Sequence, residues 1–152
     1  MKKIKASLLV ILAVVAIAFT SCKGGGEPPV VPPTLAELIK GKTYRVSIIT
    51  VPPSTTPNAN FSGFTIAFNA AGTGATLNCN CDPTTGGIFT NTAVTYSAGT
   101  NTITFTGTMP SGWPSTLSNV SAGTTGSTLN FNATIGLTNK PEIVYAFALV
   151  TP

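Results

Sequence analysis

The sequence of 152 residues contains no histidine, and charged side chains make up only 8% of it. Histidine is the commonest general base in enzymes and the commonest protein ligand of transition metals. Without it, and with so few acids and bases, most catalytic or metal-binding constellations cannot be assembled. The composition therefore predicts a protein that is not an enzyme and that holds no metal or other cofactor.

The net charge of +4 at pH 7 depends on three lysines near the N-terminus. Lys2, Lys3 and Lys5 precede an apolar run that is typical of a cleaved signal. From Cys22 onward, five basic residues stand against four acidic ones, so the net charge is +1. Proteins that bind nucleic acids carry a dense basic patch. We therefore predict no nucleic-acid partner.

Residues 1–21 have the pattern of a secretory signal peptide. The three lysines form a positive start, and the apolar run Leu8–Phe19 follows without interruption. This run is shorter than the roughly 20 residues that a transmembrane helix needs. A buried core helix is the alternative interpretation. The abrupt change of composition after Cys22 favours cleavage instead.

The residues Phe19-Thr20-Ser21-Cys22 resemble the lipobox of bacterial lipoproteins. The resemblance implies that Cys22 becomes the N-terminus, with a diacylglycerol thioether on its sulfur and a fatty acyl group such as palmitate on its amine. Several acyl chains anchor a protein to a membrane stably, whereas one chain binds only marginally. Lipoproteins of the inner membrane commonly have Asp after this cysteine, so Lys23 implies the outer membrane. A soluble secreted protein, in which Cys22 has no such role, is the alternative.

Residues 23–33 read KGGGEPPVVPP. Glycine-rich chain is flexible and proline-rich chain favours an extended polyproline helix, so no packed structure is expected. The reach is at most about 30 Å, at roughly 3.1 Å per residue. We therefore expect residues 22–33 to tether the lipid to a folded domain over residues 34–152.

A short helix is predicted where this domain starts. Thr34 and Glu37 have the spacing of a capping box, in which each side chain accepts a hydrogen bond from the other residue's backbone. Gly41 stands where a left-handed residue would end the helix. We expect a helix over residues 35–40. Its inward-facing side chains are Leu35, Leu38 and Ile39.

From Thr43 onward, apolar residues recur at every second position, as in antiparallel strands with one buried face. The clearest run alternates Thr or Asn with the apolar residues Leu129, Phe131, Ala133 and Ile135. The same rule places Tyr44, Val46 and Ile48 on the inner face of the first strand. The last run, 142–150, is apolar on both faces, so we expect it to be covered on the outside as well.

Turn-forming segments divide the domain into eight predicted strands. Their ranges are 43–51, 62–69, 74–81, 88–97, 101–107, 115–121, 127–136 and 142–150. The separators are short and suit hairpins, and a meander of eight hairpin strands avoids exposed edges by closing on itself. We therefore predict an all-β fold: an eight-stranded antiparallel up-and-down meander, as a barrel or a flattened sandwich, with one short N-terminal helix.

Three stretches of the domain resemble lipocalin-like lipoproteins that are common in Bacteroidota. They are the helix with Leu38-x-x-Gly41-x-x-Tyr44, the second strand and its turn over Phe61–Gly72, and the closing strand over Tyr145–Leu149. The resemblance covers most of residues 34–152 and implies a lipocalin-like barrel. Most such proteins have no known activity, so it implies a fold more than a function.

The domain offers three carboxylates for acid–base catalysis. Glu37 belongs to the capping box, Asp82 begins a turn before a proline, and Glu142 opens a strand after another. Paired catalysis requires two carboxylates that converge, and no two of these are expected to do so. We therefore predict no catalytic residues.

Cys79-Asn80-Cys81 is the most distinctive motif. Two thiols without histidine or a second cysteine pair make a weak metal site. The usual redox motif has two intervening residues rather than one. Plain packing stays open, because both cysteines share a predicted face with Ala75 and Leu77. A disulfide between Cys79 and Cys81 is the remaining interpretation, since the envelope is oxidising and lipidation consumes the thiol of Cys22.

Large aromatic side chains are predicted on the inner faces of the strands, where they fill the barrel or line a pocket for a small apolar ligand. They are Tyr44, Phe64, Phe68, Tyr96, Phe105, Phe131, Tyr145 and Phe147. Trp113 lies in a Pro/Gly-rich segment. We expect it either to cover one mouth of the barrel and join this lining or to be exposed as a contact residue.

These features leave three functions open. The first is binding of a small apolar ligand inside the barrel. The second is binding of polysaccharide or a partner protein through the Thr/Asn-rich exterior and Trp113, and the third is an enzyme. The interpretation that we favour is a lipid-anchored protein of the cell outer membrane with a non-enzymatic binding or structural domain.

Overall fold

The computed structural model describes residues 29–57, 59, 61–81, 88–136 and 141–152. The predicted signal peptide, Cys22, most of the tether and Asp82 lie outside the described residues. The chain divides into two compact units, Met1–Pro32 and Pro33–Pro152. Residues 29–32 of the first unit are exposed and have no regular structure. No helix in the described ranges is long and apolar enough to cross a membrane.

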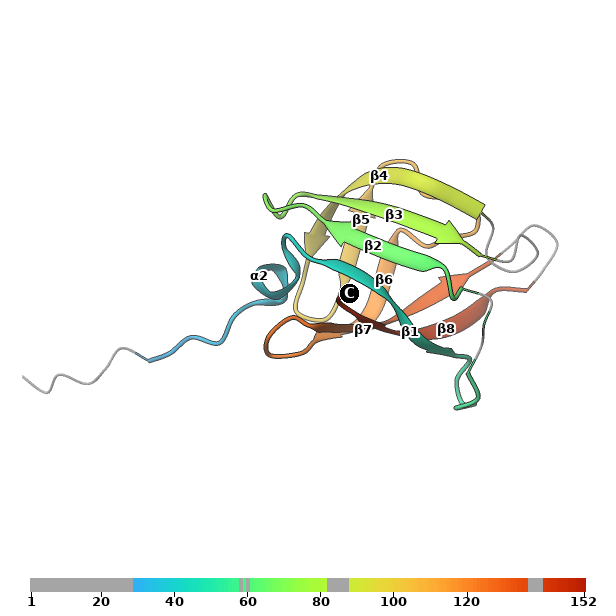
Figure 1. Cartoon of the computed structure of the whole chain (residues 1–152), viewed down its shortest axis with the longest axis horizontal. Coiled ribbons are helices and arrows are strands. Elements are labelled where there is room, and N and C mark those ends of the chain that lie inside the picture. Colours follow the sequence, from blue (N-terminus) through green and yellow to red (C-terminus); the bar gives the residue numbers. More distant parts are fainter. Residues whose placement is uncertain (1–28, 58, 60, 82–87, 137–140) are drawn as a thin grey trace, which may run out of the picture. The chain divides into compact units, whose positions relative to one another are not determined.

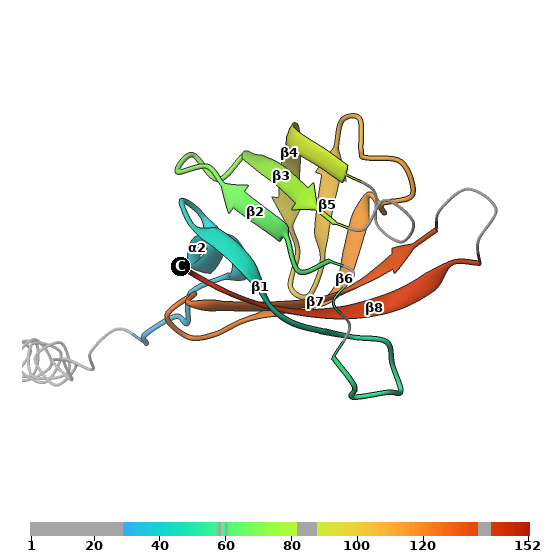
Figure 2. The same ribbon diagram turned by 45° about the vertical axis from the view of Figure 1, so that its right-hand side comes forward.

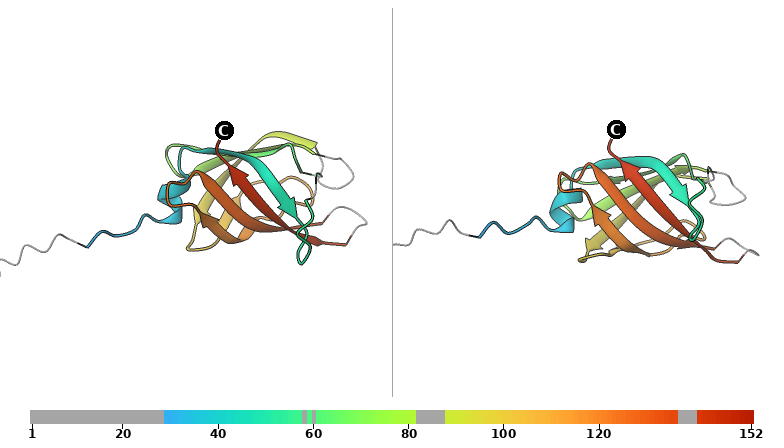
Figure 3. Two further views of the ribbon diagram at one scale, coloured as in Figure 1. Left: turned by 60° about the horizontal axis from the view of Figure 1, so that its bottom comes forward. Right: turned by 90° about the horizontal axis from the view of Figure 1, so that it is seen from below.

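The second unit is an eight-stranded antiparallel barrel preceded by one short helix (Figure 1). Its elements are α2 (Leu35–Ile39), β1 (Thr43–Thr50), β2 (Phe64–Phe68), β3 (Gly74–Asn80), β4 (Ile88–Ala98), β5 (Ile103–Thr106), β6 (Thr116–Ala122), β7 (Thr128–Ile135) and β8 (Ile143–Val150). Consecutive strands pair, and β8 lies between β7 and β1, which closes the barrel (Figure 3). The predicted all-β meander is confirmed in its barrel form.

The predicted helix start is confirmed. The Glu37 backbone N–H donates to the Thr34 hydroxyl over 3.3 Å, and the Thr34 backbone N–H donates to the Glu37 carboxylate over 2.7 Å. The helix ends at Ile39, and Gly41 follows in the left-handed region with φ +71°. Leu35 and Ile39 are buried in the core, so α2 covers one end of the barrel (Figure 2).

Burial follows the predicted alternation most clearly in β7. Its inward residues Leu129, Phe131, Ala133 and Ile135 are all buried. Asn130 and Thr134 point outward and are exposed. In β8, Val144 is 43% exposed, so the expected outer cover of this strand is wrong at that position.

The predicted inner face of β1 is wrong beyond Val46. Val46 and Ile48 pair with the consecutive residues Leu149 and Ala148 of β8, so β1 carries one extra residue between them. Such a bulge reverses the direction of all side chains that follow it. Ile48 is therefore 42% exposed, and Ile49, at 1%, enters the core instead.

Two asparagines mark further bulges. Asn91 in β4 and Asn119 in β6 have φ +49° and +51°, and the pairing register shifts beside each of them. Asparagine tolerates this left-handed conformation better than most side chains. The Asn91 backbone N–H donates to Asn78 Oδ1 over 2.6 Å, which replaces a lost ladder bond. These bulges bend β4 and β6 and change which of their residues face inward.

Candidate functional site

The two ends of the barrel differ. Helix α2 and the turns 69–73, 99–102 and 123–127 lie at one end, which we call the α2 end. The other end receives Phe61 from the β1–β2 connection and Trp113 from the β5–β6 connection, and we call it the mouth. Because loops carry these two side chains, the mouth is the part of the interior that strand pairing does not fix directly.

Trp113 lies inside the mouth. Its indole stacks on the ring of Phe64, with centroids 4.8 Å apart and planes 15° apart. The rings of Phe61 and Phe89 meet it edge-on, at 5.6 and 5.3 Å. Trp113 is only 7% exposed, so of its two predicted locations the structure has the one over the mouth. Each such ring pair contributes about 0.5–1.5 kcal/mol beyond the burial of its area.

The backbone of the β5–β6 connection directs Trp113 inward. The backbone N–H of Trp113 donates to the Pro110 carbonyl oxygen over 3.0 Å, across a turn in which Gly112 has φ +79°. The Gly112 carbonyl oxygen accepts from the Gly136 N–H over 3.0 Å, which joins this connection to the end of β7. Glycine adopts positive φ without steric cost, and this explains its place beside the tryptophan.

The aromatic residues predicted to line a ligand pocket are all buried, and they form two groups along the barrel. The group at the mouth contains Phe64, Trp113, Phe131, Tyr145 and Phe147, joined through ring contacts that include a stacked Phe131–Phe147 pair at 4.9 Å. The group at the α2 end contains Tyr44, Phe68 and Tyr96. Phe105 is buried in the same core. Rings that contact one another in this way favour a filled interior.

Two aromatic residues of the mouth were missed by sequence reasoning. Phe61 lies outside the alternating runs, just before β2. Phe89 has the opposite parity to Val94 and Tyr96, yet it packs against the core because the bulge at Asn91 reverses the strand. An asparagine in the middle of a strand was the one available signal for Phe89.

The tyrosines at the α2 end have different partners. The Tyr44 hydroxyl donates to the Gly126 carbonyl oxygen over 2.8 Å. Burial raises the pKa of Tyr44 to about 12, with a smaller contribution from the charge of Tyr96. Burial also raises the pKa of Tyr96, whose hydroxyl oxygen is buried without a hydrogen-bond partner in the described ranges. The α2 end therefore stabilises neutral phenols.

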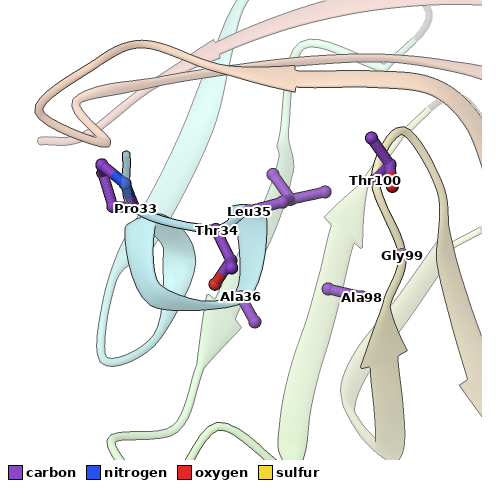
Figure 4. Close-up of a pocket in the computed structure, with 7 residues that line it drawn as sticks. All are labelled: Pro33, Thr34, Leu35, Ala36, Ala98, Gly99 and Thr100. Atoms are coloured by element: carbon purple, nitrogen blue, oxygen red, sulfur yellow. The ribbon is translucent and has the colours of Figure 1, made fainter. Parts of the chain in front are cut away.

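A groove of about 450 Å³ lies between the start of α2 and the β4–β5 turn (Figure 4). Its lining consists of Pro33, Thr34, Leu35, Ala36, Ala98, Gly99 and Thr100. The volume is within the range of small-molecule sites. The lining offers methyl groups and two hydroxyls but no charge, so it suits a neutral molecule and no acid–base chemistry.

The structure joins the sulfur atoms of Cys79 and Cys81, whose Cα atoms are 5.1 Å apart. Both side chains are buried, and Cys79 shares the inner face of β3 with Ala75 and Leu77, as predicted. Among the described residues, no three His, Cys, Asp or Glu side chains gather as a metal site would require. The arrangement is compatible with a disulfide, which stays a prediction.

The described carboxylates lie at opposite ends of the barrel. Glu37 is held at α2 by Thr34, whose backbone N–H and hydroxyl lower the pKa of Glu37. Glu142 is exposed just before β8, at the mouth. These two groups do not converge on one point, so they do not form a catalytic pair.

Comparisons of the chain with protein-family models, with curated proteins and with solved structures found no match. The fold and the residues themselves are therefore the basis for any proposal about function.

Proposed function

We propose that this chain is a lipid-anchored protein of the bacterial outer membrane whose barrel acts without catalysis, as a binding or structural module. The observation that carries the proposal is the order of its parts. Cys22 follows an apolar run, residues 23–33 have the composition of a tether, and the hydrophobic core of the described residues begins at Leu35. A lipid on Cys22 would therefore leave the barrel intact.

The ligand class that we favour for the barrel is a small apolar molecule, admitted at the mouth. Phe61 and Trp113 belong to connections, so they can move aside without breaking a strand ladder. The surfaces that they cover are the rings of Phe64 and Phe147. A planar or branched hydrocarbon would replace these contacts with similar ones. A charged ligand would find no counter-ion among the buried side chains of the described residues.

Mass spectrometry of protein extracted from membranes tests both parts of the proposal. The peptide that begins at Cys22 should carry the mass of the acyl groups, and an apolar molecule should co-purify with the folded barrel. Titration with apolar probes should change the emission of Trp113, which is the single tryptophan of the chain. Unmodified Cys22 would contradict the anchor. If no apolar molecule co-purifies with the barrel and no probe changes the emission of Trp113, the proposed apolar ligand would be contradicted.

The second candidate is binding of polysaccharide or a partner protein on the outer face of the barrel. Strands β2 to β8 contain no charged residue, and Thr, Asn and Ser are frequent at the outward positions of β2 to β7. A shallow groove of about 310 Å³ crosses β2, β3 and β4, where Ala67, Gly74, Thr76 and Ala93 leave room. Hydroxyl and amide groups suit the hydrogen bonds of sugars.

A glycan array distinguishes this candidate from the first. Binding that Ala93→Arg abolishes and that Thr104→Arg, on the outer face of β5, leaves unchanged would favour the groove. A blank array, together with a co-purified apolar molecule, would favour the mouth.

A further inference from the structure

We propose that the Cys79–Cys81 disulfide and Trp113 form a redox-sensitive latch at the mouth, in which the oxidised cysteines keep Trp113 packed and their reduction releases it. This inference goes beyond either proposed ligand and does not require the lipid anchor. It depends on two contacts that run from the cysteines to the indole and on a bend in the backbone between the cysteines.

The first contact is the pairing of β3 with its two neighbouring strands. Cys79 of β3 lies between Phe64 of β2 and Phe89 of β4 in the pairing register. The same two phenylalanines hold Trp113, one by stacking at 4.8 Å and one edge-on at 5.3 Å. The cysteine that starts the motif is therefore paired directly with both residues.

The second contact joins Asn80, the residue between the cysteines, to Gly63, the residue before Phe64. A Cβ atom placed on Gly63 would lie 2.7 Å from the Asn80 carbonyl oxygen and 3.2 Å from its backbone nitrogen. The two backbones are thus packed without room for a methyl group. Any shift of Asn80 acts directly on Gly63, and through it on the ring that carries Trp113.

The third element is the bend at the end of β3. The Cα atoms of Cys79 and Cys81 are 5.1 Å apart. Residues two apart in a regular strand are separated by about 6.6 Å, which is two rises of roughly 3.3 Å. In a regular strand the parallel Cβ vectors of such residues also keep their sulfurs apart. A bond between the sulfurs therefore requires the backbone to bend here, whereas two free thiols do not. Reduction therefore allows this segment to extend, and Asn80 moves with it.

The chemical step needs a small dithiol as reductant. One thiolate of the reductant attacks a sulfur of the pair, which breaks the Cys79–Cys81 bond, releases one cysteine as a thiol and leaves the other in a mixed disulfide with the reductant. The second thiol of the reductant then attacks its own sulfur in the mixed disulfide and releases the remaining cysteine as a thiol. Two electrons and two protons pass to the cysteines, and the reductant becomes a cyclic disulfide. Cys79 is fully buried and Cys81 is 5% exposed, so the attack requires a transient opening of this end. By linkage, a state that opens the mouth also favours reduction.

The test begins with thiol counting on denatured, unreduced protein. Absence of free thiols at Cys79 and Cys81 is expected, and two free thiols per chain would overturn the proposal. Native protein is then compared with and without dithiothreitol. Reduction should shift the emission of Trp113 to longer wavelength and increase its quenching by acrylamide, while the far-ultraviolet circular dichroism stays unchanged. Wavelength and quenching are measured rather than intensity, because a nearby disulfide itself quenches indole emission.

The second part of the test uses a variant without the two cysteines and needs no reductant. Without any reductant, Cys79→Ala/Cys81→Ala should show the longer-wavelength, more quenchable emission of Trp113 that is expected of the reduced protein. Dithiothreitol should not change it further. Cys22→Ala is the matched control, because it removes the other cysteine and should respond like the parent chain. A folded double variant with Trp113 as shielded as in the oxidised protein would overturn the latch. The same conclusion would follow from a fully reduced protein with unchanged emission.

Discussion

The hydroxyl of Tyr44 donates a hydrogen bond of 2.8 Å to the carbonyl oxygen of Gly126, so the first strand is tied to the β6–β7 turn. Both residues are buried. Gly126 also packs against the carbonyl oxygen of Leu38 in α2, where a side chain would not fit. The turn is therefore held between the helix and β1, and Tyr44 is the residue that anchors it from inside the barrel.

Tyr44→Phe should lower the free energy of unfolding by about 1–2 kcal/mol, because the variant loses one buried hydrogen bond and leaves a carbonyl oxygen without its donor. Urea denaturation at pH 7 measures the loss. Lys42→Met is the control at the same turn, since the Lys42 ammonium donates to the Thr125 carbonyl oxygen at an exposed position. The control should change stability by less than about 0.5 kcal/mol. Equal losses would mean that the Tyr44 bond is no stronger than a surface contact.

Tyr44 also makes the free energy of unfolding depend on pH in the alkaline range. Burial raises the pKa of Tyr44 to about 12 in the folded protein, and an unfolded tyrosine has a pKa of about 10. The folded state therefore binds this proton more tightly, so its contribution is complete below pH 10 and is lost as the pH rises from 10 through 12. The stability difference between the parent chain and Tyr44→Phe should shrink over this interval. Tyr96 titrates in both proteins, so a constant difference up to pH 12 would contradict the prediction.

Phe131→Ala should destabilise the barrel by roughly 3–5 kcal/mol, as the loss of a large ring from a packed core does. Phe131 is 1% exposed and stacks on Phe147 from the paired strand. Asn130→Ala changes the adjacent, outward-facing position and should alter stability by less than about 0.5 kcal/mol. Thermal or urea unfolding of the two variants provides the comparison. Similar effects at both sites would mean that the register of β7 is shifted by one residue.

Cys22→Ala should release the protein from membranes and leave the fold unchanged. The reason is that the core of the described residues begins at Leu35, well beyond the anchor. Membrane fractionation with circular dichroism of the released protein measures both effects. A variant that still partitions wholly with membranes would remove the basis for lipid anchoring.

Asn119 should tolerate glycine and resist a β-branched residue, because its φ of +51° is in the left-handed region. Asn119→Gly should change stability by less than about 0.5 kcal/mol, whereas Asn119→Val should cost about 1–2 kcal/mol. Asn130→Val provides the control at an outward position of a regular strand. If valine is tolerated equally at both positions, β6 has no bulge at Asn119.

The strands were predictable because threonine and asparagine occupy the outward positions so regularly that the apolar residues alone outline the inner face. The errors in assigning the inner face lie where a bulge changes parity. Ile48 and Ile49 are both isoleucine, so no property of the residues indicates which one enters the core. The choice depends on how β1 pairs with β8, which lies about 100 residues away in the sequence. The local pattern of apolar residues carries no information about how β1 pairs with that distant strand.

The mouth was predictable only in part for the same reason. The Pro/Gly-rich segment around Trp113 indicated a loop, and two locations for the indole followed from it. The structure has the location in which Phe61, Phe64 and Phe89 surround the ring. These three residues come from different parts of the chain, and one of them faces inward only because of the bulge at Asn91. Their convergence is a property of the closed barrel.

Closure by β8 also sets the order of events during synthesis. Arg45 and Val150 pair across the seam of the barrel, so the first strand has no partner on one side until the end of the chain has been made. A chain that stops before Ile143 would leave both β1 and β7 with unpaired edges, which recruit other chains. Premature stops and proteolysis near the C-terminus would therefore yield aggregates rather than a shortened domain.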